Sequence, residues 1–294
     1  MTATFVEEEI ASQPRLWRQV ADLAPRVASV LPARGERVAV VGCGTSWFIA
    51  QSYARLREAG GHGWTDAFAA SEFPDDRTYD RVIAISRSGT TTEVIDLLRR
   101  TTTPTVLLTA VSTTPGAEAA DQTIDLGFAD ERSVVQTRFA TTVLMLLRAH
   151  LGEDLADAIA DAETALDLDL SGLVDAEQVT FLGQDWTVGL ADEAALKTRE
   201  AAQFWAESYP AMDYRHGPLA IAQPGRLVWA FGAVPVGLAD EVAGTGATFV
   251  WHPLDPVAAL VVAQRFAVAL AHGRGLDPDR PRSLTRSVVL TAAE

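Results

Sequence analysis

Short apolar runs alternate with longer stretches of helical periodicity in the first half of the chain. The pattern predicts strands at 37–44, 81–86 and 103–111, within 63–73 and, more weakly, at 122–127; it predicts helices at 46–60, 91–101 and 137–152. Strands that are apolar throughout and alternate with helices are typical of a mostly parallel sheet covered by helices on both faces.

The same order starts again after an acidic helical stretch at 153–173, which we interpret as a bridge between two halves. Strands are predicted at 178–185, 226–234 and 247–252, and helices at 191–208 and 256–275. The two halves are weakly similar in the order of their elements. We therefore predict an α/β fold with two tandem units, one at 1–160 and one at 161–294.

Composition narrows the class of protein. The chain has 294 residues, a net charge of −15 and 48% hydrophobic residues, which argues against disorder. Its basic residues are scattered among more numerous acids, so we expect no nucleic-acid partner. We find no apolar run of membrane-spanning length and no secretory signal at the N-terminus. A single cysteine, Cys43, excludes an intrachain disulfide, and we expect a cytoplasmic protein without a membrane partner.

Two hydroxyl-rich turns follow neighbouring predicted strands. "GCGTS" (42–46) and "SRSGTTTE" (86–93) each lie between a strand and a helix. Each turn alone could be a helix cap, but together they favour a phosphate site, because hydroxyls and free N–H groups meet at helix N-termini. Neither turn has the third glycine of a dinucleotide fingerprint or the Gly-Lys-Ser/Thr of a Walker A loop. Arg87 could add a positive charge or face solvent.

A third candidate lies in the second half, at 193–218. Lys197 and Glu200 are three residues apart and share a helix face, and His216 follows in the loop "RHGP". A carboxylate and a histidine can transfer protons near neutral pH. The alternative is a surface ion pair and a structural histidine. The other histidines show no spaced ligand partner, so we expect no metal and no cofactor, and Cys43 is interpreted as a small packed residue.

Seven motifs occur in one order along the chain: "GCGTSW", "ASEF", "SRSGTTTE", "ERSVVQTRFATT", "ALKTRE…AES" (195–208), "RHGPLAI" and "PRSLTRSV". In this order the chain resembles the sugar isomerase (SIS) family, as found in the isomerase domain of glucosamine-6-phosphate synthase. The resemblance covers roughly residues 5–290. It implies two doubly wound, flavodoxin-like SIS domains, a sugar-phosphate ligand and at least a homodimer, with the active site near the subunit interface.

The resemblance also implies roles for individual residues. Glu200 matches the carboxylate that moves a proton between C1 and C2, Lys197 matches the lysine that supports it, and His216 matches the ring-opening histidine, which in the family comes from the neighbouring subunit. The phosphate-binding positions are matched by Thr45, Ser46, Ser86, Ser88 and Thr91, and Arg87 stands where the synthase has a glutamine.

Three departures from the synthase bear on the reaction. The chain starts where the isomerase part would start, so we expect no internal ammonia source and no synthesis from glutamine. Arg286 stands where the synthase has its Schiff-base lysine, and an arginine does not readily form an imine. Gln136 replaces a serine within "ERSVVQTRFATT", which looks more like the free-standing amino-sugar-phosphate isomerases and deaminases.

These observations predict a phosphosugar isomerase or deaminase that acts on a sugar or amino-sugar 6-phosphate. In a deaminase the ketimine could hydrolyse without an enzyme Schiff base, and Arg286 could anchor an anionic group. Two alternatives stay open at this point: a sugar-phosphate sensor without turnover, and a fructosamine-6-phosphate deglycase. The absence of a helix-turn-helix segment, together with Glu200 and His216, favours catalysis over a sensor.

Overall fold

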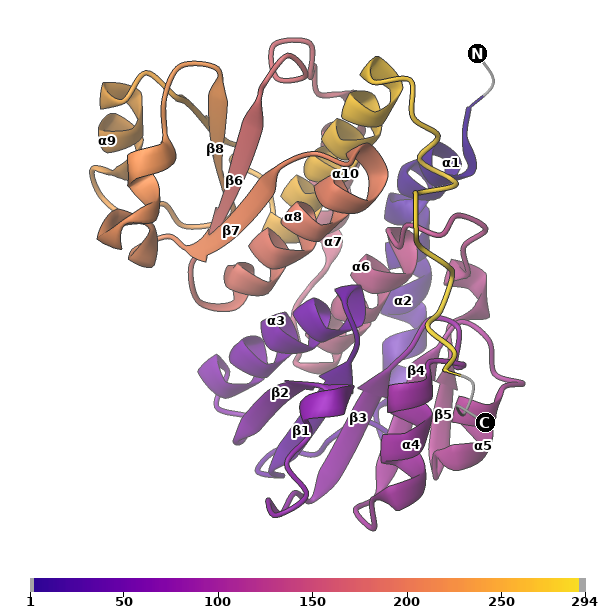
Figure 1. Cartoon of the computed structure of the whole chain (residues 1–294). Helices are drawn as coiled ribbons and strands as arrows, with labels where there is room; N and C mark the ends of the chain where they lie inside the picture. Colours follow the sequence, from indigo (N-terminus) through magenta and orange to yellow (C-terminus); the bar gives the residue numbers. More distant parts are fainter. Residues whose placement is uncertain (1–2, 291–294) are drawn as a thin grey trace. The chain divides into compact units, whose positions relative to one another are not determined.

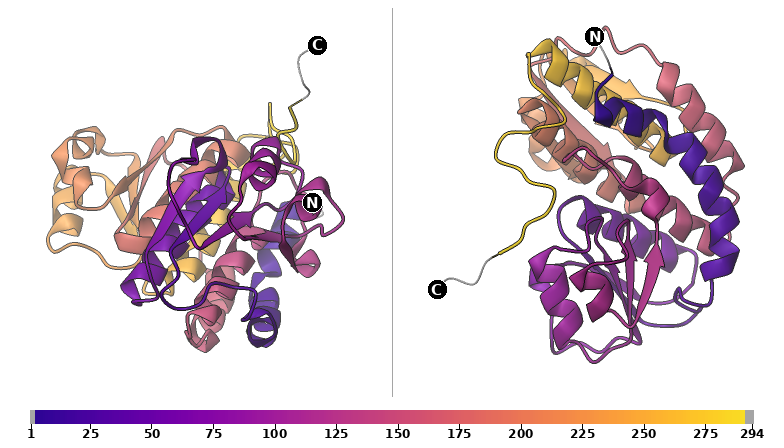
Figure 2. Two further views of the ribbon diagram at one scale, coloured as in Figure 1. Left: turned by 90° about the horizontal axis from the view of Figure 1, so that it is seen from below. Right: turned by 90° about the vertical axis from the view of Figure 1, so that its right-hand side faces the viewer.

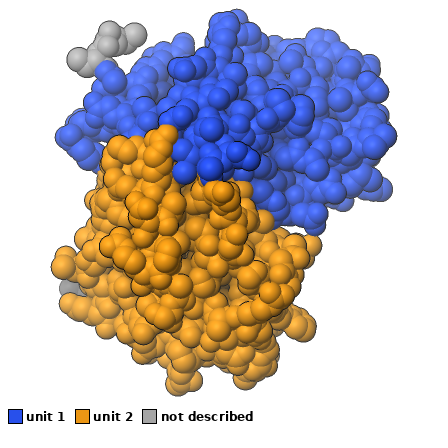
Figure 3. Space-filling view, turned by 180° about the vertical axis from the view of Figure 1, so that it is seen from behind, with its two compact units in different colours: residues 1–14, 132–137, 156–284 blue, residues 15–131, 138–155, 285–294 orange. Residues whose placement is uncertain are grey.

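Two parallel sheets organise residues 3–290, the part of the chain that the computed structural model describes. The chain divides into two compact units (Figure 3). Unit 1 comprises residues up to 14, 132–137 and 156–284, and unit 2 comprises 15–131, 138–155 and the residues from 285 onward. Each unit therefore takes segments from both halves of the chain. The predicted division at residue 160 stays a prediction.

Unit 2 contains a five-stranded parallel sheet in the order β2-β1-β3-β4-β5. The strands are β1 (Val38–Gly42), β2 (Thr65–Ala69), β3 (Arg81–Ile85), β4 (Thr105–Thr109) and β5 (Gln122–Asp125). Every residue of β1 and β4 is buried, which explains their unbroken apolar runs. All five strands that the sequence pattern predicts are present.

The helices of unit 2 connect and cover the strands of this sheet (Figure 1). They are α2 (Gln13–Val27, whose first two residues belong to unit 1), α3 (Thr45–Ala59), α4 (Thr92–Arg100), α5 (Pro115–Ala119) and α6 (Arg138–His150), with short 3₁₀ turns η1 (Ala70–Glu72) and η2 (Gly127–Ala129). Right-handed crossovers place α3 and α4 on opposite faces, because the chain moves from β1 to β2 in one direction and from β3 to β4 in the other. Residues of α4 and α5 pack over Val41, Ala84 and Leu107, and α3 contacts α6.

Unit 1 repeats the arrangement with four parallel strands in the order β7-β6-β8-β9. They are β6 (Gln178–Gly183), β7 (Ala206–Pro210), β8 (Arg226–Ala230) and β9 (Thr248–Trp251). The helices are α1 (Phe5–Ala11), α7 (Ala156–Asp167), α8 (Val188–Ala202), α9 (Leu238–Gly244) and α10 (Pro256–Gly273), with 3₁₀ turns η3 (Asp185–Thr187), η4 (Asp213–His216) and η5 (Pro218–Ile221).

Helix α10, drawn in yellow in Figure 2, packs among the other helices of unit 1. It packs against α1, α7 and α8, and most of its residues are buried. By length and composition alone α10 could cross a membrane. However, 72% of the stretch Pro256–Gly273 is buried inside the protein, as in the core helix of a globular unit. Its apolar sequence is therefore explained by packing.

Two predicted elements differ from the structure. The helix predicted to run to residue 208 ends at Ala202, because Gln203 adopts a left-handed conformation (φ 50°), and residues 206–210 form the edge strand β7. The acidic stretch 153–173 was interpreted as a bridge between the halves. It is helical only from Ala156 to Asp167, as α7, which packs against α10 within unit 1.

Candidate functional site

The two hydroxyl-rich turns lie side by side in unit 2. β1 pairs directly with β3, with Val41 opposite Ala84. Residues 43–46 and 86–91 therefore follow the carboxyl ends of two neighbouring parallel strands. The strand order reverses between β1 and β3, and the crevice at such a switch point is where open α/β sheets bind ligands. The sheet topology therefore brings together the two turns that the sequence singled out.

The turn after β1 brings the first helix close to the strand end. A Cβ added to Gly42 would lie 2.6 Å from the carbonyl carbon of Ser46, so only glycine permits this approach. Thr45 and Ser46 open α3 and are almost fully buried, yet neither hydroxyl has a hydrogen-bond partner in the part of the chain that the structure describes. Burial raises the pKa of the Cys43 thiol to about 11, so this cysteine stays protonated near neutral pH.

The turn after β3 leaves a second buried hydroxyl without a partner. Ser86 is 3% exposed, and its Oγ makes no hydrogen bond with any described residue. Ser88 Oγ accepts hydrogen bonds from the Thr90 N–H (3.2 Å) and the Thr90 hydroxyl (2.9 Å). Thr91 is the N-cap residue of α4 without a side-chain capping bond. Gly89 has φ +63°, and a Cβ there would lie 2.1 Å from Thr114 Oγ1, so this position also needs glycine.

These observations point to a binding site more than to a capping turn. An unpaired buried hydroxyl costs free energy, about 1–3 kcal/mol when no water or ligand satisfies it. Buried hydroxyls from two adjacent turns and the N-termini of α3 and α4 supply donors and a favourable helix dipole for one anion. The arrangement is therefore suited to a phosphate group.

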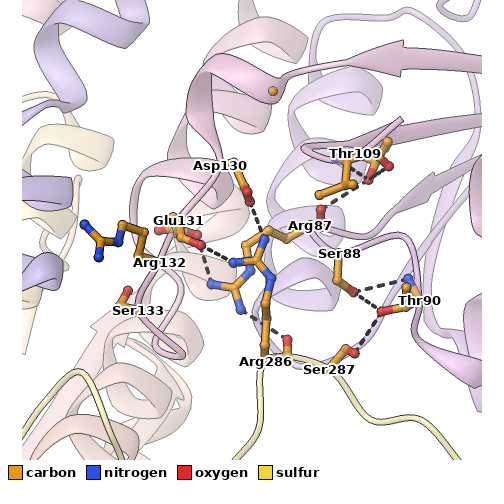
Figure 4. A network of polar contacts seen from close by, with 12 residues as sticks. Arg87, Ser88, Thr90, Thr109, Asp130, Glu131, Arg132, Ser133, Arg286 and Ser287 are labelled. Carbon is orange, nitrogen blue, oxygen red and sulfur yellow. Dashed lines mark hydrogen bonds and ion pairs between the residues drawn. The ribbon is translucent and has the colours of Figure 1, made fainter. Parts of the chain in front are cut away.

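The sequence leaves open whether Arg87 faces solvent, and in the structure it does not. Its side chain is 1% exposed, and Nη1 donates to Glu131 Oε2 at 3.2 Å, while Nη2 donates to the carbonyl of Arg286 at 3.1 Å (Figure 4). Arg286 in turn pairs with Asp130 and donates to the Glu131 carbonyl. The guanidinium groups of Arg87 and Arg286 are thus both engaged by carboxylate or carbonyl oxygens of unit 2.

Helix α8 of unit 1 carries the proton-transfer candidates. Lys197 Nζ forms an ion pair with Glu200 Oε2 and lies 3.7 Å from Glu193 Oε1. The side chains of Lys197 and Glu193 are 1% and 0% exposed, and that of Glu200 is 20% exposed. The alternative of a surface ion pair is therefore wrong. Of the two carboxylates, Glu200 is the one that is open to solvent, as a group that exchanges protons with a substrate needs to be.

The segment 132–137 of unit 1 lies against the same end of α8. Val135 packs with Ala201, the residue after Glu200, and with Ala267 of α10. The next residue, Gln136, has a buried side-chain carbonyl oxygen without a hydrogen-bond partner among residues 3–290. The structure thus places Gln136 on a segment next to the C-terminal end of α8.

Sequence reasoning missed the residue that holds this segment. Glu9 of α1 is 2% exposed and accepts hydrogen bonds from the backbone N–H of Arg132, the backbone N–H of Ser133 and the Ser133 hydroxyl. The signal was present, because Glu9 follows Val6 and precedes Ile10 on the apolar face of the helix. A charged residue at such a position predicts a specific buried partner.

His216 stands apart from Glu200 within the chain. It ends the 3₁₀ turn η4 and is exposed, and its side chain makes no hydrogen bond or ion pair with any residue from 3 to 290. Among those residues there is also no group of three or more His, Cys, Asp or Glu that could hold a metal ion. The expectation that the protein uses no metal stays a prediction.

Comparisons with known proteins agree with this geometry. A family model described as SIS domain matches residues 33–151, which include both hydroxyl-rich turns. A SIS domain lies there. The chain is 28% identical, over an alignment 352 positions long, to the isomerizing glutamine–fructose-6-phosphate aminotransferase of Aeropyrum pernix. The alignment covers 97% of this chain and 57% of the relative. The relative from Halobacterium salinarum is also 28% identical, with 97% and 59% covered. The chain thus spans little more than half the length of these curated relatives.

Solved structures share the fold over nearly the whole chain. Glucosamine-6-phosphate deaminase from Thermotoga maritima superimposes with a TM-score of 0.81 at 23% identity and covers 98% of this chain and 100% of its own. Tagatose-6-phosphate ketose/aldose isomerase from Escherichia coli has a TM-score of 0.78 at 19% identity, with 95% and 96% covered. At these identities the likeness establishes the α/β fold with parallel sheets. A second SIS domain in the remaining residues stays a prediction.

Proposed function

We propose that the protein is a phosphosugar isomerase or deaminase that acts on a sugar or amino-sugar 6-phosphate. The observation that carries the proposal is the pair of adjacent turns at the β1/β3 switch point, with buried hydroxyls that no described residue satisfies. The names of the similar proteins, which include a glucosamine-6-phosphate deaminase and a tagatose-6-phosphate isomerase, support a phosphorylated sugar as the ligand.

In this proposal unit 2 binds the phosphate group of the substrate. Thr45, Ser46, Ser86, Ser88 and Thr91 donate hydroxyl hydrogen bonds, and the N-termini of α3 and α4 stabilise the negative charge. The phosphate is remote from C1 and C2, where the reaction occurs, so these residues contribute binding and orientation. Arg87 contributes indirectly, because its guanidinium is already engaged by Glu131.

Proton transfer is assigned to Glu200. Its carboxylate removes a proton from C2 of the open-chain aldose and returns it to C1 through a cis-enediol, or through the corresponding enamine for an amino sugar. Lys197 holds the carboxylate in place through their ion pair. His216 opens the pyranose ring, and we propose that it does so in the active site of a second copy, as the resemblance to the family implies; its exposed side chain is accessible for this.

Deamination and isomerisation differ only after the proton transfer. The ketimine from a 2-amino sugar would react with water and release ammonia and the ketose phosphate, so no lysine imine is needed. The ion pair of Arg286 with Asp130 supports this view, because that side chain is engaged within unit 2. A homodimer and a cytoplasmic location belong to the same proposal.

The test is a panel of aldose, ketose and 2-amino-aldose 6-phosphates, read for both ketose phosphate and ammonia. We expect turnover of at least one compound, with ammonia only from the amino sugars. Glu200→Gln should lower kcat by about 10³-fold, the usual contribution of a general acid–base group, and leave substrate binding nearly unchanged.

The neighbouring acid Glu207 provides a matched control. It lies on the edge strand β7 and accepts hydrogen bonds from Trp205 Nε1 at 3.0 Å and from the Tyr209 hydroxyl at 3.3 Å. Glu207→Gln should keep kcat within about twofold. Binding of these phosphates without turnover by the wild type would replace the enzyme with a sensor, and turnover of lysine-linked fructosamine phosphates alone would make it a deglycase.

A further inference from the structure

The C-terminal tail segment, defined here as residues 285–290, follows the hydroxyl loop, residues 86–92, along its whole length. Thr92 N–H donates to the Val288 carbonyl at 3.2 Å, and the Leu290 N–H donates to Thr92 Oγ1 at 2.9 Å. The hydroxyls of Thr90 and Ser287 lie 2.9 Å apart. Hydrogen bonds therefore connect the tail segment to the first turn of α4 and to the loop before it.

An acid–base network fixes the start of the tail segment. The Arg286 guanidinium pairs with Asp130 and donates to the Glu131 carbonyl, and the Arg286 carbonyl accepts from Arg87 Nη2 (Figure 4). Glu131 accepts from Arg87 on one oxygen and from the Arg138 N–H, 2.8 Å away, on the other. The turn at 130–131 thereby contacts the tail segment and the hydroxyl loop at once.

Arg87 is held from both its side chain and its backbone. Its carbonyl accepts hydrogen bonds from the Thr109 hydroxyl at 3.2 Å and from the Ala110 N–H at 3.0 Å, while its guanidinium reaches Glu131 and the tail segment. Ser86 and Ser88 flank Arg87 directly, so the network also fixes the two hydroxyls on either side. A buried ion pair adds little net stability, because desolvation offsets its attraction, so stability alone does not explain this network.

We propose that Arg87, Glu131, Asp130 and Arg286 form a latch that holds the tail segment on the hydroxyl loop and keeps the loop in its phosphate-binding shape. The four are positioning residues. They act through Ser86, Ser88 and Thr90 and do not contact the sugar. The inference rests on the proposed function, because it assigns to these residues a part in binding the same phosphate.

The Asp130–Arg286 pair is the place to test the latch. The two side chains are 40% and 35% exposed, so Asp130→Asn and Arg286→Gln can be made without burying an unpaired charge. The singles and the double variant are compared for the Kd of inorganic phosphate, for KM and kcat with the active compound of the panel, and for amide hydrogen exchange across residues 86–92. Arg286→Lys serves as the conservative variant.

We expect each single variant to weaken phosphate binding about fivefold, to raise KM by the same factor, and to change kcat less than twofold. The double variant should bind no worse than the singles, because the two residues act as one pair. Exchange at 86–92 should become faster in all three, and Arg286→Lys should recover part of the affinity.

The exposed pair Arg37–Asp80 is a matched control in the same unit. It joins the starts of β1 and β3, with Arg37 Nη2 and Asp80 Oδ1 3.2 Å apart. The hydroxyl loop follows the other, carboxyl end of β3. Arg37→Gln and Asp80→Asn should leave phosphate affinity and loop exchange unchanged.

The latch is overturned if the Asp130 and Arg286 variants bind phosphate as tightly as the wild type, or more tightly, or if their effects multiply in the double variant. A wild type that binds neither phosphate nor any sugar phosphate would instead refute the proposed function, and the latch with it. The two failures are distinct, since only the second appears in the unmodified protein.

Discussion

The two units end their first strand in the same way and use the following turn differently. β1 ends at Gly42 and β6 ends at Gly183, and a Cβ at either glycine would meet the backbone of the next helical segment. In unit 1 the Thr187 hydroxyl accepts the Gln184 N–H at 2.8 Å and lies within donating distance of the Gln184 and Phe231 carbonyls. In unit 2 the hydroxyls of the corresponding turn have no partner among the described residues.

The difference continues at the neighbouring strand. After β3 the chain places Ser86, Ser88 and Thr91 before α4, whereas after β8 it continues with apolar Phe231 and with Gly232. The same backbone arrangement thus leaves hydroxyls without a protein partner in the described part of unit 2 and a closed, hydrogen-bonded turn in unit 1. The turns of the two units share their backbone arrangement and differ in whether their hydroxyl groups are already hydrogen-bonded within the protein.

The glycines test whether the shared backbone is essential. Gly183→Ala and Gly42→Ala should each lower the free energy of unfolding by about 2–3 kcal/mol, because neither clash involves a flexible side chain that can move away. Gly183→Ala should cost more, since its Cβ would lie 2.2 Å from the Thr187 carbonyl oxygen. Urea unfolding measures both. Gly172→Ala, where nothing lies within 4 Å, is the control and should change little.

The hydroxyls test whether the two turns have separate tasks. Ser86→Ala should weaken phosphate binding about tenfold through loss of one charge-assisted hydrogen bond, and leave thermal stability equal or slightly higher. Thr187→Val should do the opposite, with a loss of about 1–3 kcal/mol in unfolding free energy and unchanged phosphate affinity, because it leaves the Gln184 N–H unpaired. Equal effects of the two substitutions on binding would abolish the distinction.

Cys43 gives the smallest effect and concerns the turn after β1 alone. A helix N-terminus usually lowers a thiol pKa, but burial prevails here and raises it to about 11. Only about one thiol in a thousand would be ionised at pH 8, and this fraction should rise tenfold per pH unit below pH 11. Alkylation of the native protein by iodoacetamide should be slow at pH 8 and should become fast in denaturant. Rapid native alkylation would show that the turn is open.

Most of the fold could be predicted from the sequence because the central strands are buried on both faces. The apolar runs at β1, β3 and β4 are too short for a typical buried helix and are followed by turn residues, which favours strands. The edge strand β7 was missed because the helical pattern of α8 continues through "FWAES" beyond its true end. Only the left-handed backbone at Gln203 stops the helix, and glutamine is not a typical residue for that conformation.

The site was predicted less completely than the fold. The hydroxyl turns and the Lys197–Glu200 pair could be found, since each is contained in one short segment. The ion pair of Arg87 with Glu131 joins residues 44 positions apart in sequence, and the Arg286–Asp130 pair joins residues 156 positions apart, so no local pattern shows them. Glu9 could have been found, because a charge on the apolar face of α1 requires a partner.

The interleaving of segments between the units has a consequence for synthesis of the chain on the ribosome. Unit 1 contains both the first helix, α1, and the last, α10, and the sheet of unit 2 receives the tail segment only after residue 285. Neither unit can complete its contacts until the chain has emerged to about residue 285 or beyond. Residues 1–160 therefore cannot reach their complete fold before residues 161–285 are made, and a gene split at residue 160 would yield two incomplete fragments.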